Sequence, residues 1–94
     1  MIVDWSRRSL RNLASLLEYI KVESIQNSDL VAGRIAKAVR LLETQPEMGR
    51  PGRVTGTREL VVPDTPYIIP YRIRRERLQL IAVVDGHQKW PTKM

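Results

Sequence analysis

The sequence has no cysteine, no phenylalanine and a single histidine among its 94 residues. The absence of cysteine excludes a disulfide-stapled fold, a Cys-containing zinc site and a cysteine nucleophile. Since two tryptophans and three tyrosines are the only aromatic residues, we expect a mostly aliphatic core. The longest apolar run, 80–84, is far shorter than the ~20 residues that span a bilayer. We therefore expect no membrane segment and no targeting signal, and a cytoplasmic protein.

The composition that is present indicates one small, basic domain spanning residues 1–94. The chain has sixteen lysines and arginines but only ten acidic residues, which gives a formal net charge of +6. Twelve of these cations are arginines, whose planar fork matches carboxylates and phosphates. An acidic partner is expected, either a nucleic acid or an acidic protein, with a merely solvated basic surface as the alternative.

Seven arginines share the segment 50–77 and are the candidates for contacting that partner: Arg50, Arg53, Arg58, Arg72, Arg74, Arg75 and Arg77. Arg72 lies inside a mostly apolar segment, which indicates either an ion pair or an anion-binding group in a cleft. Arg58 begins the preceding apolar segment and allows the same two interpretations.

Two amphipathic helices are predicted in the first half, after a short strand over 1–5. Leucines and isoleucines recur at helical spacing over 7–22, and Ser6 is a suitable N-cap. After a connection over 23–27, Ser28 is the second predicted N-cap, and Pro46 marks the end of the second helix. Two such helices joined by a short connection predict an antiparallel hairpin.

After a glycine-rich loop over 48–56, apolar residues recur at every second position instead of at helical spacing. Strands are predicted over 57–62, 67–73 and 78–84, the third being central because it is apolar on both faces. Pro70 predicts that the second of them is interrupted or lies at an edge, where a partner strand can add. The expected fold is α+β, ordered β-α-α-β-β-β, with the helical hairpin on a small antiparallel sheet.

Motifs for catalysis are scarce. The sequence has no phosphate-binding loop, no nucleophile elbow and no convincing set of metal ligands, so neither a cofactor nor a metal is predicted. His87 follows Gly86 in a predicted turn and is either a surface residue or a general acid–base group. Trp5 and Trp90 are predicted to cover the core.

Four segments carry a resemblance to a known family. They are the helical hairpin, Pro-Glu-Met-Gly-Arg-Pro at 46–51, Gly-Thr-Arg-Glu-Leu-Val-Val at 56–62, and Tyr-Ile-Ile-Pro-Tyr-Arg-Ile at 67–73. The closing Gly-His-Gln-Lys-Trp-Pro at 86–91 adds to them. With these segments the chain resembles the RelE/ParE superfamily of toxins from bacterial type II toxin–antitoxin systems, over nearly its whole length.

The resemblance implies a compact toxin that an acidic antitoxin, ParD-like or RelB-like, neutralises. The Pro-Tyr-Arg strand is more similar to the ParE branch, whose members inhibit DNA gyrase and are not known as nucleases. The alternative is the RelE branch, which cleaves mRNA on the ribosome without a metal. Arg58 and Arg72 would then hold the phosphate, and His87 would move the proton. A third possibility is a non-toxic member that only binds its antitoxin. Enzymatic activity stays open, with the non-enzymatic alternative favoured.

Overall fold

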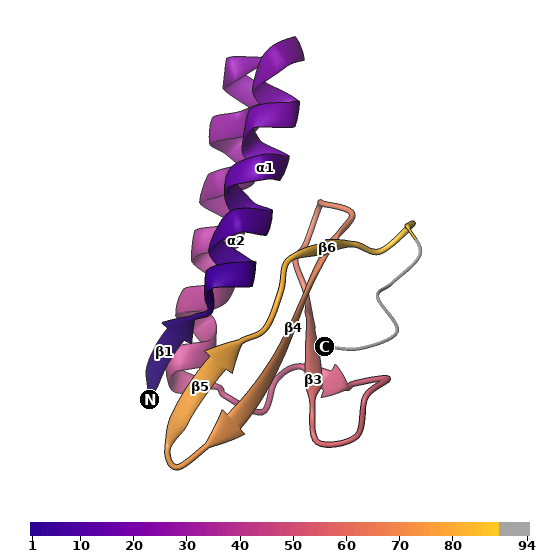
Figure 1. Cartoon of the computed structure of the whole chain (residues 1–94). Helices are drawn as coiled ribbons and strands as arrows, with labels where there is room; N and C mark the ends of the chain where they lie inside the picture. Colours follow the sequence, from indigo (N-terminus) through magenta and orange to yellow (C-terminus); the bar gives the residue numbers. More distant parts are fainter. Residues whose placement is uncertain (89–94) are drawn as a thin grey trace.

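The computed structural model describes residues 1–88 and has the predicted α+β architecture (Figure 1). Its elements are β1 (Ile2–Trp5), α1 (Arg7–Glu23), α2 (Ile25–Thr44), β2 (Arg50–Pro51), β3 (Arg58–Val61), β4 (Tyr67–Arg74), β5 (Arg77–Leu80) and β6 (Val84–Asp85). Two short strands are additions to the predicted order. β2 forms inside the predicted loop, and β6 is the far end of the third predicted strand after a break at 81–83. The predicted position of Trp90 lies outside the described residues.

The two helices form the predicted antiparallel hairpin, but the connection between them is shorter than predicted. Ser24 alone joins them: its N–H donates to the Ile20 carbonyl at 2.9 Å, and its hydroxyl accepts the Asn27 N–H at 3.1 Å. One residue thus ends α1 and caps α2. The prediction of Ser28 as the N-cap is wrong, because Ser28 is buried in α2 and its hydroxyl donates to the Leu17 carbonyl of α1 at 2.9 Å.

The strands form one sheet in the order β1-β5-β4-β3-β2, with β6 pairing beside the first residues of β4. All neighbours are antiparallel except β1 and β5, so the sheet is mixed at one edge rather than wholly antiparallel. β5 is an internal strand, as predicted, and β4 lies at the centre. Of the two alternatives that Pro70 predicts, an interruption or an edge position, the edge position does not apply, because β4 has neighbours on both sides.

The predicted interruption at Pro70 is confirmed, and it explains why β5 and β6 are separate. The Pro70 carbonyl accepts the Ile81 N–H at 2.8 Å, so the proline nitrogen faces the same side of β4. Because that nitrogen has no hydrogen to donate, the hydrogen-bonded pairing on this side of β4 is interrupted at Pro70. Pairing with β5 covers Tyr71 to Arg74, and pairing resumes with β6 at Ile68.

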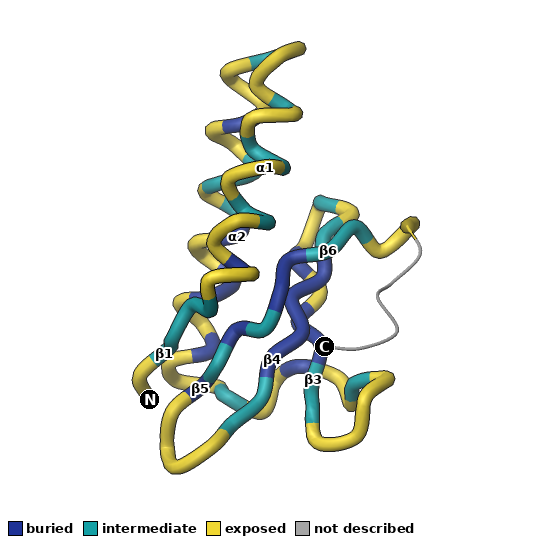
Figure 2. The backbone as a smooth tube through the Cα atoms, viewed as in Figure 1, coloured by how far each residue is buried: buried dark blue, intermediate teal, exposed yellow. Residues whose placement is uncertain are grey.

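The core lies between α2 and one face of the sheet, where the buried segments in Figure 2 meet. Ile35 and Leu42 of α2 pack there against aliphatic residues of the strands and against Tyr71, all almost without exposure. Burial of such side chains supplies about 1.5–3 kcal/mol each. As predicted, Trp5 is partly buried against this core.

The far half of the helical hairpin extends beyond the sheet (Figure 1). Several apolar side chains there are exposed: Tyr19 is 81% exposed and Val22 is 86% exposed. No helix within residues 1–88 is long and apolar enough to span a membrane.

Candidate functional site

Tyr71, at the centre of β4, fastens the chain between α2 and β2. Its hydroxyl donates to the Pro46 carbonyl at 2.8 Å and accepts the Gly49 N–H at 2.9 Å. Gly49 is buried against the ring, and a Cβ at this position would lie 2.6 Å from the Tyr71 hydroxyl. Only glycine lets the backbone come this close. Burial raises the pKa of Tyr71, so the phenol stays protonated and keeps its donor.

Arg58 of β3 fastens the same segment from the neighbouring strand. It pairs with Tyr71 in the sheet and so lies on the same face. Its Nη1 donates to the carbonyls of Glu47 and Gly49, at 3.1 and 2.8 Å. Arg58 forms no ion pair among residues 1–88, and its part in binding an anion stays a prediction.

Glu59, the next residue of β3, points to the opposite face and is 3% exposed. Its Oε1 accepts from Arg50 Nη2 at 3.0 Å, and its Oε2 accepts the N–H of Arg53 at 3.0 Å and its Nε at 3.1 Å. Burial raises the pKa of Glu59, but the hydrogen bonds from Arg53 and Arg50 outweigh it, so the pKa lies below its usual value. Arg50 and Arg53 are therefore already bound to a carboxylate of their own chain.

We call the set of Tyr71, Arg58 and Glu59, together with the segment 46–53 that they hold, the β3–β4 clamp. It unites three of the segments that carry the family resemblance. Sequence reasoning missed Tyr71, Gly49 and Glu59 as members of one unit. Pairing the motif segments 56–62 and 67–73 as an antiparallel hairpin would have indicated this unit, because it places Arg58 opposite Tyr71.

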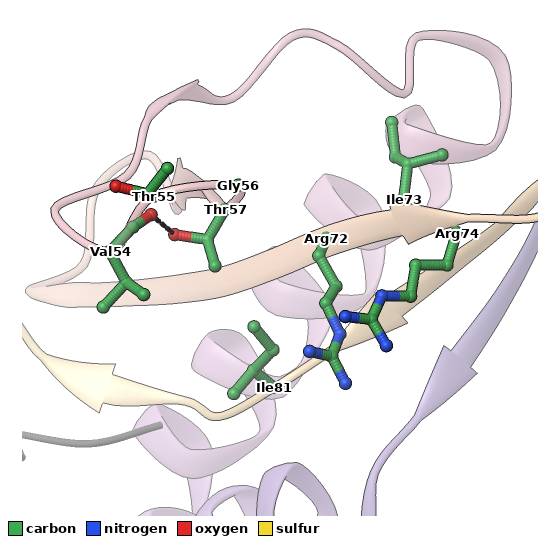
Figure 3. Close-up of a pocket in the computed structure, with 8 residues that line it drawn as sticks. All are labelled: Val54, Thr55, Gly56, Thr57, Arg72, Ile73, Arg74 and Ile81. Carbon is green, nitrogen blue, oxygen red and sulfur yellow. Dashed lines mark hydrogen bonds between the residues drawn. The ribbon is translucent and has the colours of Figure 1, made fainter.

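The remaining candidate arginines lie in the β4–β5 hairpin, and they differ in the groups that they bind. Arg77 binds Asp4 of β1 through two hydrogen bonds of 2.7 Å, and this pairing lowers the pKa of Asp4. Arg72 donates its Nε to the Gln79 side-chain oxygen at 2.9 Å. Arg74 is exposed and lines the same hollow as Arg72 (Figure 3). Arg72 thus lines a hollow and forms no ion pair among residues 1–88, while its role as an anion-binding group stays a prediction.

The three residues named for RNA cleavage do not come together. Arg72 follows Tyr71 in β4 and so faces the side of the sheet opposite to Arg58. His87 lies beyond Asp85, which pairs with Tyr67 at the other end of β4. Five residues of strand, roughly 16 Å, separate Tyr67 from Arg72. His87 is highly exposed, and its Nδ1 lies 3.4 Å from Asp85. No group of three metal-ligating side chains forms within residues 1–88.

Apolar side chains line a separate hollow of about 270 Å³ between α2 and β3. Leu41, Met48 and Val61 contribute its exposed apolar surface, at 41%, 43% and 47% exposure. Arg34 and Lys37 add two positive charges at the same place, and Asp64 adds one negative charge. Such a surface, apolar with basic neighbours, suits an acidic amphipathic segment of another protein.

The fold places the chain in a class of small α+β proteins known from solved structures. One chain in a structure of the chromosomal ParDE TA system from P. aeruginosa has the same fold, with a TM-score of 0.81. The two chains are 22% identical, and the match covers 90% of this chain and 95% of the other. At this identity the likeness establishes the fold.

The sequence comparison identifies the family. The model of the family described as ParE toxin of type II toxin–antitoxin system, parDE, matches residues 3–90. A curated protein of Sinorhizobium fredii, Y4kP, which is provisionally named a toxin, is 44% identical over 89 residues, covering 95% of this chain and 92% of that protein. The chain therefore belongs to the ParE toxin family of type II toxin–antitoxin systems, as the resemblance of its motifs implies.

Proposed function

We propose that this toxin inhibits DNA gyrase. The observation that carries the proposal is the match of the ParE family over residues 3–90. The geometry agrees with it, because the residues that RNA cleavage would require lie on different faces and at different ends of the sheet. Inhibition by binding needs no catalytic set, only an accessible surface.

A supercoiling assay with purified gyrase and relaxed plasmid tests the proposal. The full-length chain, with its fold verified by circular dichroism, should inhibit supercoiling at micromolar excess. Primer-extension mapping on translating ribosomes runs in parallel with the same preparation. Unchanged supercoiling together with mRNA cleavage that Arg72→Ala abolishes would overturn the proposal in favour of a ribosome-dependent nuclease.

We also propose that a cognate acidic antitoxin neutralises the toxin by covering apolar surface on the hairpin and on the α2–β3 hollow. Support comes from the exposure of Val22 at the far end of the hairpin and of Met48 and Val61 in the hollow. A net charge of +6 adds electrostatic attraction to an acidic chain.

Two measurements test the antitoxin proposal. Val61→Asp introduces a charge into the hollow and should weaken binding of the antitoxin, whereas Val54→Asp, the same change on an exposed residue outside the hairpin and the hollow, should not. The association rate should fall as salt is added, because charge steering is screened within about 10 Å at 0.1 M ionic strength. A rate that is independent of salt contradicts the electrostatic part, and equal affinities of the two variants contradict the surface.

A further inference from the structure

A groove crosses the outer face of the sheet and reaches the beginning of α1, and the toxin function leaves it unexplained. It consists of two adjoining hollows of about 280 and 370 Å³ that share Arg72 and Ile81 in their walls. The first also contains Arg74, and the second also contains Arg8 at the beginning of α1. In Figure 3, the Arg72 and Arg74 side chains extend from β4 in the same direction, toward Ile81. We call this the Arg72 groove.

The charge of the Arg72 groove is not neutralised within residues 1–88. The carboxylate in its wall, Asp4, already takes two hydrogen bonds from Arg77. Arg8, Arg72 and Arg74 form no ion pair among the described residues. Three guanidinium groups thus line two adjoining hollows, and none of the three has an ion-pair partner among residues 1–88.

Arg72 is held in place by a neutral group, which distinguishes it from the other ordered arginines of the outer face. Gln79 accepts its Nε at 2.9 Å, and both Nη nitrogens have no hydrogen-bond partner within residues 1–88. By contrast, Arg50 and Arg77 form ion pairs with carboxylates. An amide that orients a guanidinium without cancelling its charge prepares the outer nitrogens for an anion.

The polar wall of the first hollow fits phosphate oxygens. Thr55 contributes a hydroxyl from the turn before β3, where Gly56 has a φ of 82°, whereas the Thr57 hydroxyl in the same wall donates to the Val54 carbonyl at 2.6 Å. Several guanidiniums in a row, each able to bind a separate phosphate, match the repeating charge of a nucleic-acid backbone better than one carboxylate. The guanidiniums line hollows rather than a flat surface, so a flexible single strand can bring its phosphates into them, whereas a rigid duplex presents phosphates only on its outside. Apolar surface for a protein partner lies elsewhere, in the α2–β3 hollow.

We propose that the Arg72 groove binds the phosphodiester backbone of a single-stranded nucleic acid, independently of the inhibition of gyrase. Arg72 and Arg74 bind phosphate oxygens, Arg8 extends the track across β5, and Gln79 is a positioning residue for Arg72. This binding involves no cleavage and no metal-ligand set.

Fluorescence anisotropy of a labelled 12-nucleotide single strand with the full-length chain tests the groove. Arg72→Gln should weaken binding at least about tenfold, because a charge-assisted contact is lost. The slope of log affinity against log salt should fall by about 0.7. Arg40→Gln is the matched control, since Arg40 lies exposed on α2 and lines neither hollow. Equal losses for the two variants would overturn the proposal, because binding would then reflect net charge alone.

A second pair of variants tests the role of Gln79. Gln79→Glu supplies Arg72 with an ion-pair partner and should abolish strand binding while the thermal midpoint is kept. Gln26→Glu, on an exposed position of α2, makes the same change far from the groove and should reduce binding only slightly. Unchanged binding of Gln79→Glu, in a folded protein, contradicts the assignment.

Parallel titrations identify the ligand. DNA and RNA single strands of one sequence distinguish the two sources of the same phosphodiester chemistry, and binding of either supports the groove. Tighter binding of the matching duplex would overturn the assignment to a single strand. Binding of a glutamate-rich peptide, without binding of either oligonucleotide, would overturn it in favour of an acidic protein. Since no gyrase is present, failure here leaves the supercoiling result independent.

Discussion

Tyr71 and Arg72 are neighbours in β4, yet they belong to two regions with opposite characters. Tyr71 faces the core and the β3–β4 clamp, where its hydroxyl and the Arg58 guanidinium are bound to backbone groups. Arg72 faces the outer groove, where its Nη nitrogens are without partners in the described chain. A strand sends successive side chains to opposite faces, so a single motif can serve structure and binding at once.

Arginine content alone therefore does not locate a binding site in this chain. Four of the seven candidate arginines are bound within the chain: Arg50, Arg53, Arg58 and Arg77. Their removal should primarily cost stability. Within residues 1–88, Arg72 and Arg74 bind neither a carboxylate nor a backbone carbonyl, and Arg72 binds only the neutral Gln79 amide, so their removal should primarily cost binding.

The largest expected effect is that of Glu59→Ala. The substitution removes the shared acceptor of two guanidiniums and of the Arg53 N–H, and it should lower the free energy of unfolding by about 3 kcal/mol. The estimate is at the low end for a buried pair because both arginines are about half exposed. Urea denaturation followed by circular dichroism measures the change. Arg72→Gln, on the groove side, should cost less than about 0.5 kcal/mol. Similar costs for both would remove the distinction between the regions.

Tyr71→Phe should have the next largest effect. It keeps the packed ring but leaves the buried Gly49 N–H without its acceptor, which should cost about 2 kcal/mol. Tyr19→Phe makes the same change on a residue that is 81% exposed and should cost almost nothing. The two unfolding midpoints in urea are compared directly. A neutral Tyr71→Phe would show that Arg58 alone holds the segment 46–49.

The pH dependence of stability should reveal the clamp as well. Folding lowers the pKa of Glu59, so its stabilisation is fully present above its ordinary value of 4.5 and is lost as pH falls through the lower folded pKa. Thermal midpoints of the natural chain and of Glu59→Gln should therefore converge below pH 4.5. Asp4 also has a lowered pKa but is present in both proteins, so it cancels in the difference. A constant difference down to strongly acidic pH would contradict this prediction.

The sequence predicted the elements better than it predicted the site. Apolar periodicity located both helices and the main strands, because burial of one face dictates it. The cap of α2 was misplaced at Ser28 because either serine can cap a helix, and only the tight one-residue connection selects Ser24. The groove depends on which arginines find acceptors. That is decided by contacts across the sheet, such as the one between Arg72 and Gln79, and not by local pattern.

The smallest expected effect concerns the turn between β4 and β5, next to the groove. Arg75 and Glu76 have φ values of 50° and 63°, in the left-handed region that side chains disfavour. Two such residues between the paired Arg74 and Arg77 form the kind of two-residue hairpin turn that favours Asn-Gly. Replacing them by Asn-Gly should raise the free energy of unfolding by about 1 kcal/mol.

This double substitution also shows whether the groove extends to the hairpin tip. It removes one positive and one negative charge, so the net charge stays at +6 and a change in strand binding reports local contacts. Neither residue lines the hollows, so oligonucleotide affinity should be unchanged while stability rises. The Ala-Ala variant removes the same charges but keeps the disfavoured φ values, and it should gain no stability. Weaker strand binding by both Asn-Gly and Ala-Ala would instead show that Arg75 contacts the ligand. The strained turn would then serve binding rather than folding.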